Sequence, residues 1–360
     1  MPSNTADRVL SEDSTTYMSL EHGEPRDFWA QFFRDWRESH GFGCRSVYGK
    51  DIDLYGDLIE RNLSLTTPAF SWMEREELIS IQYSQIDQEV KSLAALWLAN
   101  PIKQGNTVAI LCSHPYRRIV SLLTALRLGL IPLLFDPTGS VAVVNFLEFV
   151  NYDHIHCEPP VLDWMPEAIV PKALKLTEKS SSSVVESYRY SASSVALKFI
   201  DPFSGGVNSV IDIAAQDLFL RLIRDAYYIV KLSKGDRLAA GINLQDCSSP
   251  LIELMALICG ASLTYLRTQI STSGLSKLMA ESFDLIGIPL TMIEPLMEAQ
   301  KQNPKSGEWK RWYRNPMDSH RVVEWQSLVK HLALEEVPHA DLMWTCLLYT
   351  SDAADDTPCV

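Results

Sequence analysis

Strand-like and helix-like segments alternate along the first half of the chain, and this alternation most constrains the fold. Apolar runs at 107–112 and 131–135 have the length and composition of buried strands, and residues 116–128 between them have the period of an amphipathic helix. The turn 102–108 (IKQGNTV) is echoed by 232–238 (LSKGDRL). Recurring units of this kind predict an α/β fold with largely parallel sheets flanked by helices.

The composition narrows the class of protein. Of 360 residues, 46% are hydrophobic and 21% are charged, as in globular proteins with a large core. The formal net charge of −13 disfavours nonspecific nucleic-acid binding, because phosphate contacts need clustered Lys and Arg. No apolar run is long enough to span a bilayer, the N-terminus lacks a secretory signal, and the seven cysteines form no CxxC pair. We therefore expect a cytoplasmic protein with reduced thiols, no membrane span and no nucleic-acid partner.

Local patterns predict two helices in more detail. Aromatic residues in 26–38 recur with a helical period, and we expect them to pack in the core rather than to dock a partner. Ser84, followed by Asp87 three residues later, is typical of a capping box at a helix start. The helix at 116–128 is expected to carry three arginines outward: Arg117, Arg118 and Arg127.

We divide the chain near Ser180, at its serine run, and leave open whether the two parts interleave. The expected parts are a disordered or loosely attached segment (1–24), a first βα subdomain (25–180), a second βα subdomain with the phosphate-loop remnant (181–303), an incomplete segment (304–344) and a sequencing-adapter artefact (345–360). The last part contains CLLYTSDAADD, which resembles a translated adapter used in preparing sequencing libraries. On that interpretation the natural protein continues beyond Trp344, and a genuine tail is the alternative.

Three segments together resemble the adenylate-forming superfamily, which contains acyl-CoA ligases and the adenylation domains of peptide synthetases. Residues 80–132 are similar to the family's opening, with GNTVAI for "G-D-x-V-A-I" and LGLIP for "L-G-x-x-P". Residues 234–263 match "G-D-R-V" followed by "G-A-T-L", and 286–292 are similar to "x-G-V-P-T-x-x". Their order and spacing cover the chain from about 55 to 297.

The resemblance implies a fold, an activity and partners. The fold would be the large N-terminal domain of such an enzyme, with two βα subdomains and with the small C-terminal domain absent. The activity would be ATP-dependent and Mg-dependent activation of a carboxylic acid through an acyl-adenylate. The acyl group would then pass to a thiol acceptor, either CoA or a carrier protein.

The same resemblance marks a phosphate-binding loop after the strand-like stretch 196–200. Backbone N–H groups, hydroxyls and a Lys in such a loop hold a triphosphate. The candidate nucleotide-binding residues are Ser204, Gly205, Gly206, Asn208 and Ser209. This loop is shorter than the family's, Asn208 stands at the Lys position, and Asp201 adds negative charge. Weaker phosphate binding is therefore expected.

A second candidate site is the acid pocket. The resemblance assigns it to Asp246, Ser248, Ser249 and Gly287, with Asp246 where the family usually has a His-containing motif. No catalytic residue is identified. Two functions therefore remain: an acid-activating enzyme, present as a truncated and impaired copy, or a catalytically inactive adenylation-like module that binds or scaffolds.

Three other patterns have competing interpretations. Residues 153–158 (DHIHCE) could hold a metal, but a structural role is favoured because no second ligand pair is nearby. His114 follows a central strand and could be catalytic, although a loop His that fills space is favoured. Basic and aromatic residues interleave in 301–314, where a solvated helix face is favoured over a nucleic-acid surface.

Overall fold

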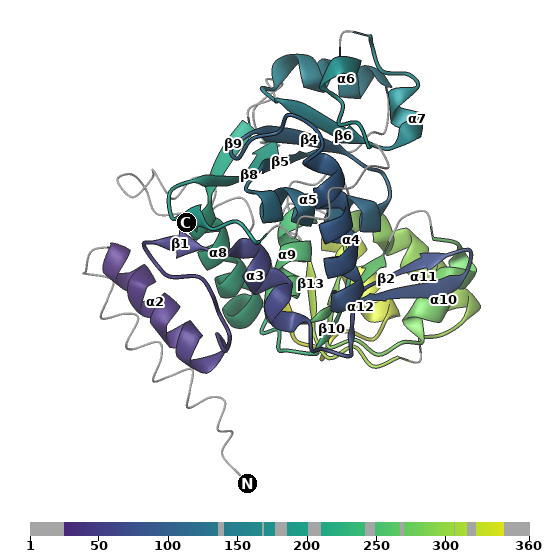
Figure 1. The fold of residues 1–360 in the computed structure, drawn as a ribbon. Helices are drawn as coiled ribbons and strands as arrows, with labels where there is room; N and C mark the ends of the chain where they lie inside the picture. Colours follow the sequence, from purple (N-terminus) through teal and green to yellow (C-terminus); the bar gives the residue numbers. More distant parts are fainter. Residues whose placement is uncertain are drawn as a thin grey trace.

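Two open sheets form the framework of the computed structural model (Figure 1). The structure describes residues 25–135, 140–167, 169–176, 186–200, 210–241, 249–266, 270–305, 307–314 and 322–341. The strand order is β6-β4-β5-β8-β9 in the first sheet and β14-β13-β12-β10-β11-β2-β3 in the second sheet. Within each of these sheets all neighbouring strands are parallel except one edge hairpin, β8–β9 or β2–β3. The predicted α/β class with largely parallel sheets flanked by helices is confirmed.

The first sheet contains β4 (Thr107–Leu111), β5 (Ile131–Leu134), β6 (His154–Cys157), β8 (Val195–Ile200) and β9 (Val210–Ala214). The neighbouring helices are α4 (Tyr83–Trp97), α5 (Pro115–Leu128), α6 (Ser140–Phe149) and α7 (Pro159–Leu162). Every residue of β4 is buried, which agrees with its continuous apolar sequence and its central position.

The second sheet contains β2 (Pro68–Glu74), β3 (Glu77–Gln82), β10 (Arg237–Gly241), β11 (Ser262–Leu266), β12 (Leu285–Gly287), β13 (Trp312–Arg314) and β14 (His339–Asp341). Its helices are α9 (Ser249–Cys259), α10 (Thr272–Met279), α11 (Ile293–Gln302) and α12 (Val322–His331). Helix α8 (Ala215–Ile223) follows β9 and packs against β8 and α9. Helix α8 continues as a π-helical stretch at Arg224–Ile229. The N-terminal part adds α2 (Pro25–Ser39), α3 (Leu54–Leu58) and the strand β1 (Asp51–Ile52), which pairs with β7 (Tyr190–Ser191).

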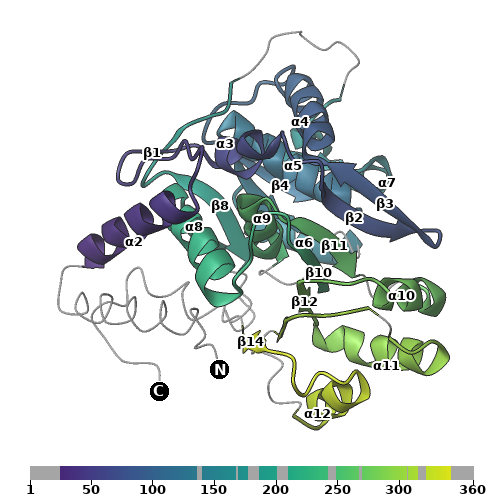
Figure 2. The ribbon, with the colours of Figure 1, turned by 90° about the horizontal axis from the view of Figure 1, so that it is seen from below.

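A common hydrophobic core joins the two sheets. It contains Leu122 of α5, Leu254 of α9, Phe70 of β2 and Leu197 of β8. Residues of α6 and α7 pack on the opposite face of the first sheet, and residues of α10, α11 and α12 pack on the opposite face of the second. Figure 2 shows α10, α11 and α12 in succession along that outer side. The helices α5 and α9 therefore lie between the sheets, where few of their residues can reach solvent.

The two echoed turns have the same structure. Gly105 and Gly235 have φ angles of 82° and 84°, in the left-handed region that favours glycine. The Gly105 N–H donates to the carbonyl of Gly129 at 2.8 Å, and the Gly235 N–H donates to the carbonyl of Gly260 at 3.0 Å. Gly129 and Gly260 follow α5 and α9, each with a φ of 71°. The sequence echo thus marks two equivalent βα units.

The equivalence extends to the edge hairpins. The register shifts between Pro68 and Phe70 in β2 and between Val195 and Leu197 in β8, each time at the start of the hairpin. We call residues 68–157 the first repeat and 195–287 the second repeat. In both, a hairpin precedes three parallel strands, and the order in the sheet is the same.

The repeats exchange their hairpins. Hairpin β2–β3 of the first repeat pairs with β11 of the second, and hairpin β8–β9 of the second repeat pairs with β5 of the first. A cut near Ser180 would therefore separate strands that share a sheet. The sequence left open whether the two parts interleave, and the pairing of the strands shows that they do.

Several local expectations can now be compared with the structure. Phe32, Phe33 and Trp36 of α2 are buried, as predicted for a core helix. The expected capping box at Ser84 is wrong: the Gln82 and Gln85 side chains cap α4, which starts at Tyr83. Because α4 begins at Tyr83, Ser84 already lies inside its first turn, and Asp87 instead accepts a hydrogen bond from the buried Tyr55 phenol at 2.9 Å.

The basic and aromatic segment is not a solvated helix face, so that expectation is wrong. Helix α11 ends at Gln302, and 312–314 form strand β13. Trp309, Trp312 and Tyr313 are at most 5% exposed. These large aromatic side chains lower their free energy by burial in the core, which a solvated helix would not allow.

No helix among the described residues is long and apolar enough to cross a membrane.

Candidate functional site

The carboxyl ends of the parallel strands are where ligands bind in open α/β sheets. The predicted phosphate loop, with Ser204, Gly205, Gly206, Asn208 and Ser209, lies outside the described residues. The residues on either side of it are described. Strand β8 ends at Ile200, opposite Val210 of β9, so the loop leaves the carboxyl end of a strand that is parallel to β5.

The repeats differ at this connection. Ile200 and Val210 are opposed across the second hairpin, as Met73 and Leu78 are across the first. Nine residues (201–209) join the second pair, whereas four residues (74–77) join the first through a tight turn. The longer connection is not needed to join the strands, since the equivalent hairpin closes without it. Extra chain at the carboxyl end of a parallel strand is typical of a functional loop.

The predicted acid pocket is described only in part. Asp246 and Ser248 lie outside the described residues, as does the side chain of Ser249, the first residue of α9. Gly287 ends the short strand β12 and is buried. A Cβ atom at Gly287 would lie 2.1 Å from Cζ of Tyr313, so the glycine makes room for that ring. The structure therefore gives Gly287 a packing role beside β13.

Aromatic side chains meet where the two repeats face each other. The ring of Trp72, near the end of β2, stacks on Tyr116 of α5 with centroids 5.0 Å apart and an interplanar angle of 15°. His114 lies edge-on to the same Trp72 ring, with centroids 5.5 Å apart. This is the packing role favoured by the sequence for His114. We call this junction of β2, β11, α5 and α9 the seam.

A buried ion pair crosses the seam. Arg118 of α5 donates to Oε1 of Glu253 in α9, and the Tyr265 hydroxyl of β11 donates to the same oxygen. Arg118 is 2% exposed and Glu253 is fully buried. Burial raises the pKa of the Glu253 carboxyl, and Arg118 and Tyr265 oppose that shift. We call Arg118, Glu253 and Tyr265 the seam triad.

The seam triad corrects one expectation. Arg118 and Arg127 do not point outward: each is 2% exposed, and only Arg117 of the three arginines is on the surface. Arg127 instead donates to Glu60 at 2.9 Å, and its guanidinium lies 4.7 Å from the centroid of Tyr55. One feature of the sequence could have indicated a buried ion pair: the single charged residue Glu253 within the apolar run 251–259.

The possible metal site at 153–158 has a structural role. His156 is 8% exposed, and its ring centroid lies 5.0 Å from that of Trp97. Burial lowers the pKa of His156 to about 4, so the ring is neutral near pH 7. Within the described part of the chain, no group of three or more His, Cys, Asp or Glu side chains could hold a metal ion.

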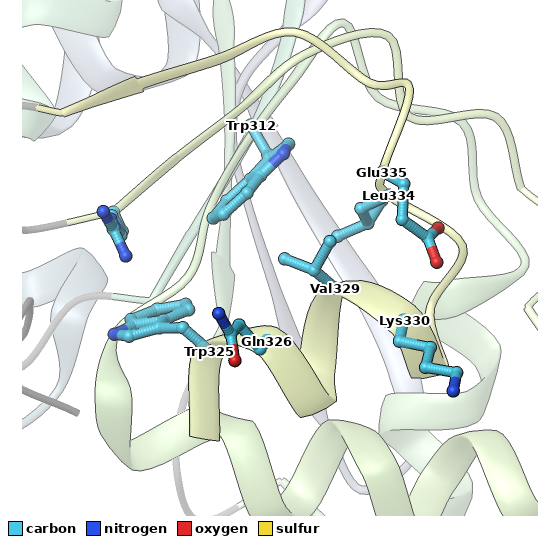
Figure 3. A pocket seen from close by; sticks show the side chains of 8 residues that line it. Trp312, Trp325, Gln326, Val329, Lys330, Leu334 and Glu335 are labelled. Atoms are coloured by element: carbon cyan, nitrogen blue, oxygen red, sulfur yellow. The ribbon is translucent and has the colours of Figure 1, made fainter. Parts of the chain in front are cut away.

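A groove lies on the outer face of the second sheet, away from the seam (Figure 3). Its volume is about 540 Å³, and Trp312 of β13 and Trp325 of α12 line one end. Their rings are stacked with centroids 6.1 Å apart, and the Arg314 guanidinium lies 5.8 Å from the Trp325 centroid. Gly287, the one residue of the predicted acid pocket that is fully described, is not among the residues that line this groove.

Comparison with known proteins supports a fold assignment. No protein-family model matches the chain, and no curated protein matches it. Among solved structures, o-succinylbenzoate coenzyme A synthetase from Bacillus subtilis with AMP matches with a TM-score of 0.63 and 14% identity, over 79% of this chain and 57% of that one. Fatty acyl-adenylate ligase from Legionella pneumophila with acyl adenylate and pyrophosphate matches with a TM-score of 0.62 and 14% identity, over 78% and 53%.

A third match is the N-terminal subdomain of NpsA from Klebsiella oxytoca, with a TM-score of 0.60 and 14% identity over 82% of this chain and 74% of that subdomain. The chain spans little more than half the length of the two ligases. It has the fold of the N-terminal part of adenylate-forming enzymes, as the sequence resemblance implied. At this identity the likeness concerns the fold alone.

Proposed function

We propose that this chain, which has the N-terminal fold of adenylate-forming enzymes, takes part in ATP-dependent activation of a carboxylic acid through an acyl-adenylate. The observation that carries the proposal is the nine-residue connection 201–209, which replaces the four-residue connection of the equivalent hairpin. Its composition, with two glycines and two serines, suits a loop whose N–H groups and hydroxyls surround phosphate. The adenylate ligands of two fold relatives add support.

The proposed nucleotide-binding residues are Ser204, Gly205, Gly206, Asn208 and Ser209. Asn208 in place of Lys removes a cation, and Asp201 adds an anion, so we infer weaker ATP binding than a lysine-bearing loop would give. The proposed acid pocket contains Asp246, Ser248, Ser249 and Gly287. We assign no magnesium ligand, because the described residues offer no cluster of metal-binding side chains.

The proposal also covers the acceptor of the acyl group and the cellular location of the protein. A thiol, either CoA or a carrier protein, would take the acyl group, and the protein would act in the cytoplasm. A second candidate function is a catalytically inactive adenylation-like module that binds or scaffolds. The specific observation favouring it is the pair of charge changes at Asp201 and Asn208.

Calorimetry with ATP tests the proposal, together with pyrophosphate exchange over a panel of acids. Asn208→Lys should tighten ATP binding about fivefold to tenfold, since a cation near a polyanion contributes on the order of 1 kcal/mol. Ser194→Lys, at the opposite end of β8 from the loop, is the matched control and should leave ATP binding unchanged. Failure of both wild type and Asn208→Lys to bind ATP would contradict the proposal. ATP binding without exchange for any acid would favour the inactive module.

A further inference from the structure

Strand β3 is an open edge of the second sheet, and no strand among the described residues pairs with its outer side (Figures 1 and 2). Natural proteins protect such edges by shortening the strand, by a charge at its centre, or by a proline or bulge, because an open edge pairs with other chains. The opposite edge, β14, has only three residues. Strand β3 has six residues, and its central residues 78–81 are Leu, Ile, Ser and Ile. Its centre therefore carries none of these protections.

The equivalent edge of the second repeat does carry a charge. The registers of the two hairpins align Asp212 of β9, opposite Lys198, with Ser80 of β3, opposite Ser71. Lys198 and Asp212 form an ion pair at 3.6 Å, whereas the hydroxyl oxygens of Ser71 and Ser80 are 2.9 Å apart. The same hairpin thus accommodates a protecting charge at this position, and the first repeat lacks it.

The backbone groups of Leu78 and Ser80 face the open side of β3. The turn before β3 has two residues, both with positive φ angles, so Glu74 and Glu77 on either side of it exchange hydrogen bonds. Bonded and non-bonded pairs alternate along an antiparallel ladder, which directs the N–H and C=O groups of Leu78 and Ser80 away from β2. Within the described part of the chain, no backbone hydrogen bond outside the ladder reaches these groups.

We propose that β3 pairs with β3 of a second copy of this chain, antiparallel and about a two-fold axis at Ile79. In this register Leu78 of each copy lies opposite Ser80 of the other, so the N–H and C=O groups of both residues find partners. Ile79 lies opposite Ile79 of the second copy, which adds an aliphatic cross-strand pair. The pairing is self-complementary and uses up the open edge, so the assembly closes at two chains.

The charges beside β3 favour the antiparallel arrangement. Glu76 and Glu77 lie at the turn end of the strand, and a parallel pair would place like carboxylates opposite each other. In the antiparallel pair Glu77 lies opposite Ile81, close to Tyr83, where α4 of the second copy begins. The first turn of α4 contains no acidic residue, so the positive end of its helix dipole complements the carboxylate of Glu77.

Sedimentation equilibrium of the intact chain over a concentration series tests this pairing. The mass of the wild type should rise from one chain to two and not beyond. Leu78→Glu with Ser80→Glu places like charges directly opposite each other, whereas Leu78→Lys with Ser80→Glu places opposite charges there. The like-charge variant should have a dissociation constant about tenfold or more above that of the opposite-charge variant. Both variants lose the Ser71–Ser80 hydrogen bond, so they are matched in this respect.

Leu98→Glu is the surface control. Leu98 is 40% exposed, against 39% for Leu78, and it follows α4, roughly 20 Å along the helix from β3. This variant should leave the dissociation constant of the wild type unchanged. Circular dichroism checks the fold of each variant, and Ser80→Asp, which copies the charge of the second repeat, should also weaken the dimer if a double variant does not fold.

Three outcomes would overturn the inference. The first is a wild type that stays a single chain at every concentration, and the second is growth beyond two chains. The third is an equal dissociation constant for the like-charge and opposite-charge variants, or for the wild type and Ser80→Asp where that variant replaces them. A dimer held together elsewhere on the surface would give this third result, because the residues opposed across β3 would not then lie at the interface.

Discussion

Buried His156 is expected to make the protein less stable in mild acid. Burial disfavours the charged ring and lowers the pKa of His156 from its ordinary value of 6.5 to about 4 in the folded protein. The unfolded chain therefore binds more protons between these values, and stability falls as pH decreases through this window. At pH 5 the loss should be about 2 kcal/mol relative to pH 8. Urea unfolding at both pH values measures it, and His156→Gln should remove this part of the pH dependence.

A second residue-scale prediction concerns the cost of breaking the seam ion pair. Arg118→Met should lower the free energy of unfolding by about 3–5 kcal/mol, because it leaves Glu253 buried without its cation. Adding Glu253→Leu should restore most of that loss, since two apolar side chains can pack where two charges were desolvated. Urea unfolding of the two variants provides the measurement. A double variant that is less stable than the single variant would show that the pair is a net stabiliser.

The arginines of α5 also show where residue patterns stop being informative. The helical period correctly predicted a helix at 116–128, and the polar face was expected to be solvated. In the structure every residue of α5 except Arg117 is buried, because the helix lies in the core shared by two sheets. A period reports which side chains share a face, but it does not report whether another layer covers that face.

At the scale of elements, the matched turns of the two repeats give a paired prediction. Gly105 and Gly235 have positive φ angles, and a Cβ atom at either would meet nothing within 4 Å. Substitution by Ala should therefore cost only the left-handed backbone conformation, about 1–2 kcal/mol at each site. The effects should add, because the turns are in separate sheets. Urea unfolding checks this, and the more permissive Asn at either position should cost less.

Comparison of the two edge hairpins identified the connection to which we assign a function. Strand β8 was predicted from sequence as the strand-like stretch 196–200. The equivalence of the hairpins could not be read from sequence, because few residues are shared between them. It depends on a common register and a common place in the sheet. Only that comparison shows that 201–209 is longer than its counterpart.

For the whole molecule, hairpin exchange predicts that neither half folds alone. A fragment ending at Ser180 would keep β2 without its partner β11 and β5 without its partner β8. Exposed, unpaired strand edges of this kind favour aggregation. Circular dichroism and solubility of fragments 1–180 and 181–360 should show no stable fold for either, whereas co-expression should recover a complex. A well-folded, soluble fragment 1–180 would contradict the exchange.

Local sequence alone determined the βα alternation, the two glycine turns and the α/β class, because these depend on contacts between residues that are close in the chain. It also carried a family resemblance that the fold of solved adenylate-forming enzymes supports. The exchange of hairpins, the burial of Arg118 and its pairing with Glu253 were decided only by tertiary structure. Their partners are far apart in sequence, and the free energy of these pairings depends on which layers exclude water from them.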